Sequence, residues 1–247
     1  MRTVILLIGI LVCIIAVHAV TGQHPDEGTI IYEVTVDMHR TLPPERQEMK
    51  TMIPEYNTFR DKLAFKGTEF LYKPLEEETD DDFGSEGGGM RMRIRRPVTE
   101  YYVNTENEKK LRAQEFMGKK YLIVDSLTVL PWRLLEGRKT ILGYECREAS
   151  YFNEERKQQI VVWYTDKLKP IAGPENYNTL PGTVLKVDIN EGERIITAVE
   201  ISLKPLKKNE IKEPSSGQRT TEAEFRAIMK EQMKRMGAQG GTFIRTN

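Results

Sequence analysis

Residues 160–203 read IVVWYTDKLKPIAGPENYNTLPGTVLKVDINEGERIITAVEISL, and this stretch decides the fold class because it predicts three antiparallel strands. In the middle strand Leu185, Val187 and Ile189 alternate with polar residues, the period-two pattern of a strand with one buried face. On the returning strand, the residues assigned to the buried face are Ile195, Thr197, Val199, Ile201 and Leu203. A hairpin with one apolar face must bury that face, so we expect the rest of the chain to extend or cover this sheet.

A turn precedes the middle strand, at Leu180-Pro181-Gly182-Thr183. Proline presets φ at about −65°, and glycine supplies the positive φ that a type II turn requires at its third position. We therefore predict a type II turn with Gly182 at positive φ.

Short segments with similar patterning recur along the chain and predict further strands. They are residues 28–38, 59–65, 69–73, 90–98, 99–104, 111–117, 120–126, 140–152 and 157–165. Residues 41–56 carry two prolines, then helix-favouring residues and a closing Pro54, which predicts one short helix. Thr221 and Glu224 form a capping box ahead of an apolar stripe, which predicts an amphipathic helix over residues 221–237.

These elements predict an α+β, β-rich fold. We expect a curved antiparallel meander sheet, half-barrel-like, of about nine to eleven strands. A short N-terminal helix and a C-terminal amphipathic helix should pack on it, the latter across the concave face. Two polar stretches, 76–89 and 205–219, are predicted to be flexible because they cannot bury apolar area. Residues 23–247 are therefore predicted to form a single domain.

The first 22 residues have the composition of a signal peptide. Arg2 gives a positive start, residues 4–17 are almost continuously apolar, and small residues near Ala19 permit cleavage. An uncleaved anchor is the alternative. The chain has 37 basic and 37 acidic side chains, and Arg2 leaves with the signal, so the mature protein is close to neutral. We expect an exported protein of the periplasm or cell envelope, or one secreted beyond it, with no membrane span after cleavage and no nucleic acid partner.

One cysteine, Cys146, follows the predicted signal peptide, which excludes a disulfide within the mature chain. A cysteine nucleophile needs a nearby histidine base, and the mature chain has only His24 and His39. We therefore expect a buried core thiol and no cofactor. The alternative is a soft-metal site for copper, in which Cys146 joins the thioethers of Met229 and Met233.

The acidic stretch 76–89 contains a second possible metal site. Its carboxylates could bind calcium, and the candidates are Asp80, Asp81, Asp82 and Glu86. Their spacing does not match that of an EF-hand loop. A solvated loop is therefore the preferred interpretation.

Aromatic side chains near strand ends are the best candidates for ligand contacts. We assign Tyr144, Trp163 and Tyr164 to a binding site on the concave side of the curved sheet. Such a surface can hold an apolar ligand, with tyrosine hydroxyls supplying directional contacts. The alternative is that the same rings fill the core.

The motifs of common enzyme classes are absent from the sequence. It contains no Gly-x-Ser-x-Gly, no phosphate-binding loop, no His-Glu-x-x-His and no paired Cys-x-x-Cys. An enzyme is therefore the less favoured interpretation, although catalytic groups can also converge only in the folded chain. The leading hypothesis is a non-enzymatic protein that binds an apolar ligand, a lipid or an envelope protein on its curved sheet.

An ordered set of short motifs lies between residues 132 and 203. The motifs are Trp132, Gly143-Tyr144-Glu145-Cys146, Trp163-Tyr164-Thr165, Gly173-Pro174 and Leu180-Pro181-Gly182. In this order they resemble the GLPGLI family of secreted proteins from Gram-negative envelopes. The hexapeptide that names the family departs here, because Thr179, Thr183 and Val184 replace its glycine, leucine and isoleucine. The resemblance implies export and a β-rich fold, and it transfers no catalytic residues because the family has no established activity.

Overall fold

The structure, a computed structural model, describes residues 26–75 and 98–238. The first strands are β1 (Glu27–Asp37), β2 (Tyr56–Lys66), β3 (Glu69–Pro74), β4 (Thr99–Asn104), β5 (Lys109–Phe116) and β6 (Lys119–Ser126). The later strands are β7 (Arg133–Ile141), β8 (Tyr144–Asn153), β9 (Gln158–Thr165), β10 (Thr183–Ile189), β11 (Arg194–Ser202) and β12 (Gln218–Thr220). The helices are the 3-10 helix η1 (Pro44–Thr51) and the α-helix α2 (Glu222–Ala238). The predicted signal peptide (1–22), the acidic loop (76–89) and residues 90–97 of a predicted strand lie outside the described residues.

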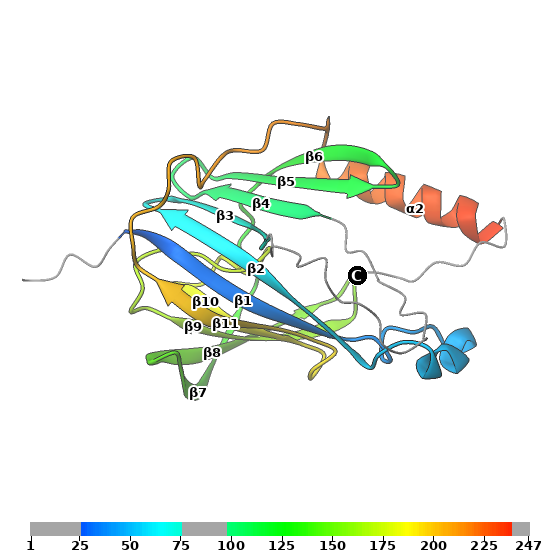
Figure 1. The fold of residues 1–247 in the computed structure, drawn as a ribbon, viewed down its shortest axis with the longest axis horizontal. Helices are drawn as coiled ribbons and strands as arrows, with labels where there is room; N and C mark the ends of the chain where they lie inside the picture. The colour runs from blue at the N-terminus through cyan, green and yellow to red at the C-terminus, as the bar shows by residue number, and fades with distance from the viewer. Residues whose placement is uncertain (1–25, 76–97, 239–247) are drawn as a thin grey trace, which may run out of the picture.

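The twelve described strands form one sheet in the order β12-β6-β5-β4-β3-β2-β1-β11-β10-β9-β8-β7. Neighbours are antiparallel, except that β12 runs parallel to β6. Most pairs are consecutive in the chain, so two meanders meet where β1 pairs with β11. In Figure 1, β4, β5, β6 and α2 lie above β7 to β11, and β1 and β2 cross between them. The predicted curved antiparallel sheet with two helices is confirmed.

The inner face of this curved sheet carries the main core. Its residues come from both meanders, which pack toward each other; fully buried members include Ile30, Leu63, Phe65, Val162, Leu185, Val187 and Ile196. Tyr32 is also buried, and its hydroxyl donates to the carbonyl oxygen of Val184 at 2.7 Å. A buried phenol needs such a partner, so this bond fixes β1 relative to β10.

Helix α2 packs on the inner face through its first two turns. Phe225 is fully buried against Tyr121 and Ile123 of β6, with Ile228 and Met229 partly buried beside it. Farther along, Met233 is 46% exposed, so the helix extends past the sheet instead of crossing its whole inner face. Neither η1 nor α2, the helices of the described residues, is long and apolar enough to cross a membrane.

Residues 205–219 were predicted to be a flexible connection, but the last two of them begin β12. Residues 205–217 contain no helix or strand, yet Ile211 packs on a small cluster on the outer face that contains Leu71 and Tyr102. Glu210 pairs with Lys62 of β2. These contacts anchor the segment and cover that part of the outer face.

The predicted strand over residues 140–152 is wrong in its first four residues and matches β8 from Tyr144 onward. The chain turns at Leu142 and Gly143, whose φ values are 49° and 83°, and β7 precedes that turn as a separate edge strand. Strand β7 is mostly exposed, so buried and exposed side chains alternate little along it. Its pairing with β8 also shifts in register between Leu134 and Arg138. A half-exposed, irregular edge strand leaves no period-two signal in the sequence.

The face assigned to β11 is also wrong over most of its length. Ile196 and Ala198 are buried, while Val199 is 38% exposed. The β1–β11 register shifts between Ile31 and Tyr32, which leaves Val199 as the extra residue of a bulge. A one-residue shift moves side chains to the opposite face, so alternation read along β11 cannot hold through it.

The turn at Leu180-Pro181-Gly182 is tighter than the predicted type II turn. The Gly182 N–H donates to the carbonyl oxygen of Leu180 at 2.8 Å, which closes a three-residue turn. The φ of Gly182 is 158°, not the value near 80° of a type II turn. Glycine is required for another reason, because a Cβ there would lie 2.2 Å from the carbonyl oxygen of Thr165.

Candidate functional site

Three turns meet at one end of the sheet. They are the turn after β1 (residues 38–43), the β8–β9 turn (154–157) and the β10–β11 turn (190–193). They come together because Val36 pairs with Arg194, and Ile160 pairs with both Ile189 and Tyr151. The turns enclose a pocket of about 340 Å³, called here the rim pocket. Its lining residues are Arg40, Thr41, Leu42, Pro43, Pro44, Arg156, Gln158, Asn190 and Glu193.

Each turn is ordered by an acidic or amide side chain that accepts backbone hydrogen bonds. Asp37 Oδ1 accepts from the N–H groups of His39 and Arg40, both at 3.0 Å. Asn153 Oδ1 accepts from the N–H groups of Glu155 and Arg156, each at 3.1 Å. Asp188 Oδ1 accepts from the Gly192 N–H at 2.7 Å. This turn chemistry holds the backbone of the rim pocket without help from a ligand.

Two side chains tie the turns to one another. The Arg40 guanidinium donates to the carbonyl oxygens of Asn190 at 2.7 Å and Glu191 at 2.9 Å. Asn190 Oδ1 accepts from the Gln159 N–H at 2.9 Å, and its Nδ2 donates to Glu193 at 2.8 Å. These bonds join the turn after β1, the β10–β11 turn and the start of β9 into one wall.

The lining is polar and contains few charged groups. Gln158 is 8% exposed and lines the pocket, while Arg156 is exposed. Among the described lining residues, Glu193 is the one acidic side chain, and its carboxylate already accepts from Asn190. Acid–base hydrolysis of a glycosidic bond uses a pair of carboxyl groups. The rim pocket therefore offers hydrogen-bonding groups for a polar ligand without such a pair.

A second group of polar residues lies in the interior. One of them, Arg194, directly follows Glu193, which lines the rim pocket. The Arg194 guanidinium donates to both carboxylate oxygens of Glu175, one bond measuring 3.1 Å. The Tyr72 hydroxyl donates to Asp61 Oδ2 at 2.6 Å. The Tyr72 ring lies 6.2 Å from that of Tyr101. These residues come from β2, β3, β4, β11 and the β9–β10 connection, and together they are called the inner cluster.

Burial and neighbouring charges raise the pKa values of three groups of the inner cluster, the two phenols and the Arg194 guanidinium. Burial raises the pKa of Tyr101 to about 12, and burial, followed by the charge of Asp61, raises the pKa of Tyr72 well above its usual value. Burial alone would lower the pKa of Arg194, but the charge and hydrogen bond of Glu175 outweigh it and raise that pKa. The phenols therefore stay protonated near neutral pH, Asp61 accepts from Tyr72, and both Glu175 oxygens accept from the Arg194 guanidinium. These contacts join strands of the two meanders.

The structure does not bring together the aromatic residues predicted to bind a ligand. Tyr164 is 2% exposed and belongs to the main core. Its neighbour Trp163 faces the other side of β9, where it pairs in register with Glu148 and the Lys139 ammonium lies 4.2 Å from its ring centroid. Tyr144 is partly buried against the core at the start of β8. The alternative interpretation, rings that fill the core, describes Tyr164.

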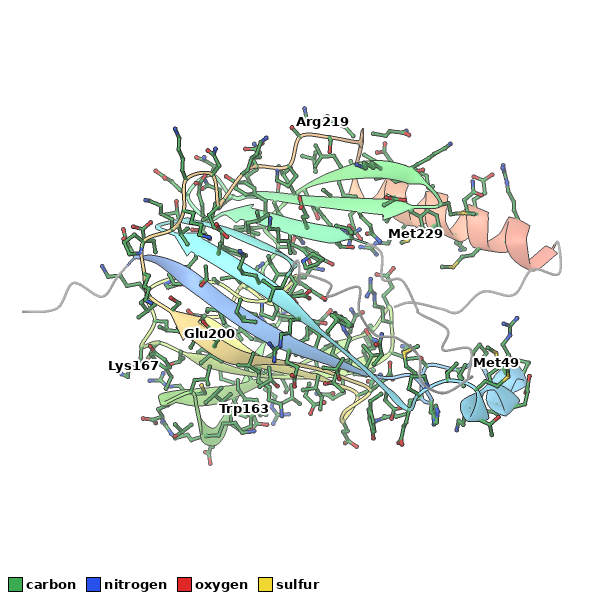
Figure 2. The ribbon with its side chains drawn as sticks, viewed as in Figure 1. Met49, Trp163, Lys167, Glu200, Arg219 and Met229 are labelled. Atoms are coloured by element: carbon green, nitrogen blue, oxygen red, sulfur yellow. The ribbon has the colours of Figure 1, made fainter. Side chains whose placement is uncertain are left out.

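The residues proposed for a soft-metal site are also separate. Cys146 is fully buried in β8, donates to the carbonyl oxygen of Tyr144 at 3.5 Å, and has a pKa raised by burial to about 11. Met229 and Met233 lie on α2, which packs at the β6 end of the sheet. Figure 2 shows Met229 below α2 near the top of the view and Trp163, from the strand next to β8, near the bottom. Within the described residues no group of three His, Cys, Asp or Glu side chains is placed to hold a metal ion.

The rim pocket was missed in the sequence because its residues belong to turns far apart in the chain. Asp37, Asn153 and Asp188 each stand at a strand end, which is a local turn signal. Such a signal marks each turn separately. It does not show that the pairing of β1 with β11 and of β9 with β10 brings the three turns together.

Comparisons with known proteins place the chain beside a glycanase domain. A family model described as "N-glycanase peptide, N-terminal domain" matches residues 89–225, more than half of the 247 residues. Two crystal structures of PNGF-II, in space groups P21 and C2, share 14% and 15% identity and give TM-scores of 0.57 and 0.55. Each alignment covers 83% of this chain but only 34% and 33% of PNGF-II, so the chain spans about a third of that protein. No curated protein is a significant match.

Proposed function

This chain belongs to the N-glycanase N-terminal domain family, and from that premise we propose that it is a non-enzymatic domain that binds a carbohydrate in the rim pocket. The observation that carries the proposal is the set of polar groups that three ordered turns direct into one pocket. Amide, carboxylate and guanidinium groups are suited to the hydroxyls of a sugar, which both donate and accept hydrogen bonds.

The family name suggests the ligand class, an N-linked glycan. The activity of a complete glycanase is not carried over, since this chain spans about a third of PNGF-II. Two features favour binding over catalysis. The rim pocket has one carboxylate among its described lining residues. Of the two carboxylates of the inner cluster, Glu175 is held by Arg194 and Asp61 accepts from Tyr72. We therefore propose that the domain holds a glycan and leaves any bond cleavage to other proteins or domains.

An apolar ligand, lipid or protein partner on the curved sheet is the weaker proposal. The main core fills much of the inner face, with side chains such as Phe65, Tyr164 and Leu185 buried to 2% exposure or less. The described pocket lies at the rim of the sheet and is polar. Its chemistry is opposite to that of an apolar carrier.

Two sequence-based expectations accompany this proposal. We propose that the protein is exported to the periplasm or cell envelope, on the strength of its signal-like first 22 residues. Its membership of the GLPGLI family, suggested by the motifs from Trp132 to Gly182, stays a prediction.

The proposal is tested by isothermal titration of the protein with an oligosaccharide released from an N-glycoprotein. We expect measurable binding, and Gln158→Ala should weaken it by about tenfold, because a buried amide that contacts a polar ligand is worth about 1 to 1.5 kcal/mol. Gln159→Ala is the matched control, since this neighbouring glutamine is exposed and does not line the pocket. Thermal unfolding of both variants checks that the fold is intact.

Two outcomes would remove the proposal. One is the absence of binding by the unmodified protein at millimolar oligosaccharide. The other is an equal effect of the two glutamine substitutions, which would place the carbohydrate elsewhere on the molecule.

A further inference from the structure

Four acidic residues around the rim pocket have protein partners. Glu154 pairs with Lys157 at 2.9 Å, and Glu155 pairs with Arg226 of α2. Glu193 accepts from the Asn190 amide, and the carboxylate of Glu175 is held by Arg194. Each of these carboxylates thus accepts from at least one protein donor, which lessens its repulsion of an anionic ligand.

The two arginines of the pocket differ in their partners. Arg40 donates to the carbonyl oxygens of Asn190 and Glu191, which hold its guanidinium without neutralising its charge. Arg156 is exposed, and no ion pair between described residues includes it. The backbone that carries Arg156 is held by Asn153, whose side chain accepts from its N–H at 3.1 Å. The pocket therefore presents two guanidinium groups: that of Arg156, which is exposed on an ordered turn, and that of Arg40, which the β10–β11 turn holds and whose charge is not neutralised.

We propose that the rim pocket selects an acidic carbohydrate, whose carboxylate binds Arg156 while its hydroxyls contact Gln158 and Glu193. This inference rests on the proposed function and names the ligand class of the same pocket. Guanidinium groups bind carboxylates through two parallel hydrogen bonds, a geometry that lysine cannot reproduce. The positive charge of Arg40 lies in the same pocket and adds to the attraction for an anion.

The test compares two probes that differ in one group. The first is a biantennary oligosaccharide that ends in N-acetylneuraminic acid, and the second is the same oligosaccharide with each carboxylate converted to a methyl amide. Isothermal titration at low and at high salt should give at least tenfold tighter binding of the acidic probe at low salt. High salt should reduce this preference, because it screens charge pairs at an exposed site.

Variants of two adjacent cations show where the preference arises. Arg156→Gln should reduce affinity for the acidic probe by about tenfold and leave affinity for the amide probe within about twofold. Lys157→Gln is the matched control, because this lysine is also exposed and charged but pairs with Glu154 and does not line the pocket. It should change neither affinity by more than about twofold.

The outcomes separate this inference from the proposed function. Equal binding of both probes to the unmodified protein would overturn the acidic preference and leave carbohydrate binding intact. A preference that survives Arg156→Gln would also overturn the inference, since another group would then bind the carboxylate. Failure of both probes to bind would remove the proposed function, and the inference with it.

Discussion

Gly182 provides a stringent test of the packing in the sheet. A Cβ at this position would lie 2.2 Å from the carbonyl oxygen of Thr165 and 2.8 Å from its carbonyl carbon, whereas ordinary contacts begin at 3.4 Å. The neighbouring atoms are backbone, and Thr165 pairs with Thr183 at the start of β10. Gly182→Ala must therefore move β9 and β10 apart by about 1 Å. Overpacking that shifts backbone costs about 1 to 3 kcal/mol, and we expect about 3 kcal/mol here because no flexible side chain can yield.

The matched control is Gly192→Ala in the β10–β11 turn. Gly192 has φ of 95°, and a Cβ there would meet nothing within 4 Å. Its cost is backbone strain alone, about 1 kcal/mol. Urea unfolding of both variants, with m-values compared to check that the unfolded states match, measures the two free energies of unfolding. A loss for Gly182→Ala no larger than that for Gly192→Ala would refute the close approach of β9 and β10.

Three further predictions concern α2, the cysteine and acid stability. Phe225→Ala should lower the free energy of unfolding, measured in urea, by about 3 kcal/mol, because it leaves a cavity where α2 packs on β6. The exposed Met233 is the control, and Met233→Ala should cost less than about 0.5 kcal/mol. Similar losses for the two variants would show that α2 is not held by Phe225. Cys146, whose pKa burial raises to about 11, should resist iodoacetamide at about pH 8 and react only in urea; rapid labelling of the folded protein would contradict its burial. The hydrogen bond from Lys62 lowers the pKa of Glu210 below its usual 4.5, so its contribution to stability is present above that value and is lost as the pH falls through the lowered pKa. Lys62→Met should make unfolding less dependent on pH in that range, and an unchanged pH profile would argue against the pair.

The fold could be predicted from the sequence wherever a strand is regular and half-buried. In β10, the buried residues Val187 and Ile189 alternate with Lys186 and Asp188, as the pattern indicated. The pattern failed in β11, where the bulge at Val199 exchanges the two faces, and in β7, where an exposed edge strand has no alternation. Irregularities of this kind depend on how a strand pairs with its neighbour. The sequence of one segment alone does not predict that pairing.

The candidate site could not be predicted in the same way. Aromatic residues were predicted to bind a ligand because their side chains are large and adaptable. Trp163 and Tyr164, however, follow each other in a strand and must face opposite sides of the sheet. The residues of the rim pocket, such as Arg40 and Arg156, look like ordinary turn residues until the sheet order brings their turns together. Spatial convergence of distant turns depends on topology, which no local spacing encodes.

NMR chemical-shift mapping of the protein during titration with the acidic oligosaccharide locates the carbohydrate and so shows whether it binds where the three turns meet. We expect the largest shifts at the backbone amides of the residues that line the rim pocket, namely Arg40, Thr41, Leu42, Arg156, Gln158, Asn190 and Glu193. Shifts that centre instead on Tyr144 and Trp163, or no shifts at millimolar oligosaccharide, would contradict this expectation.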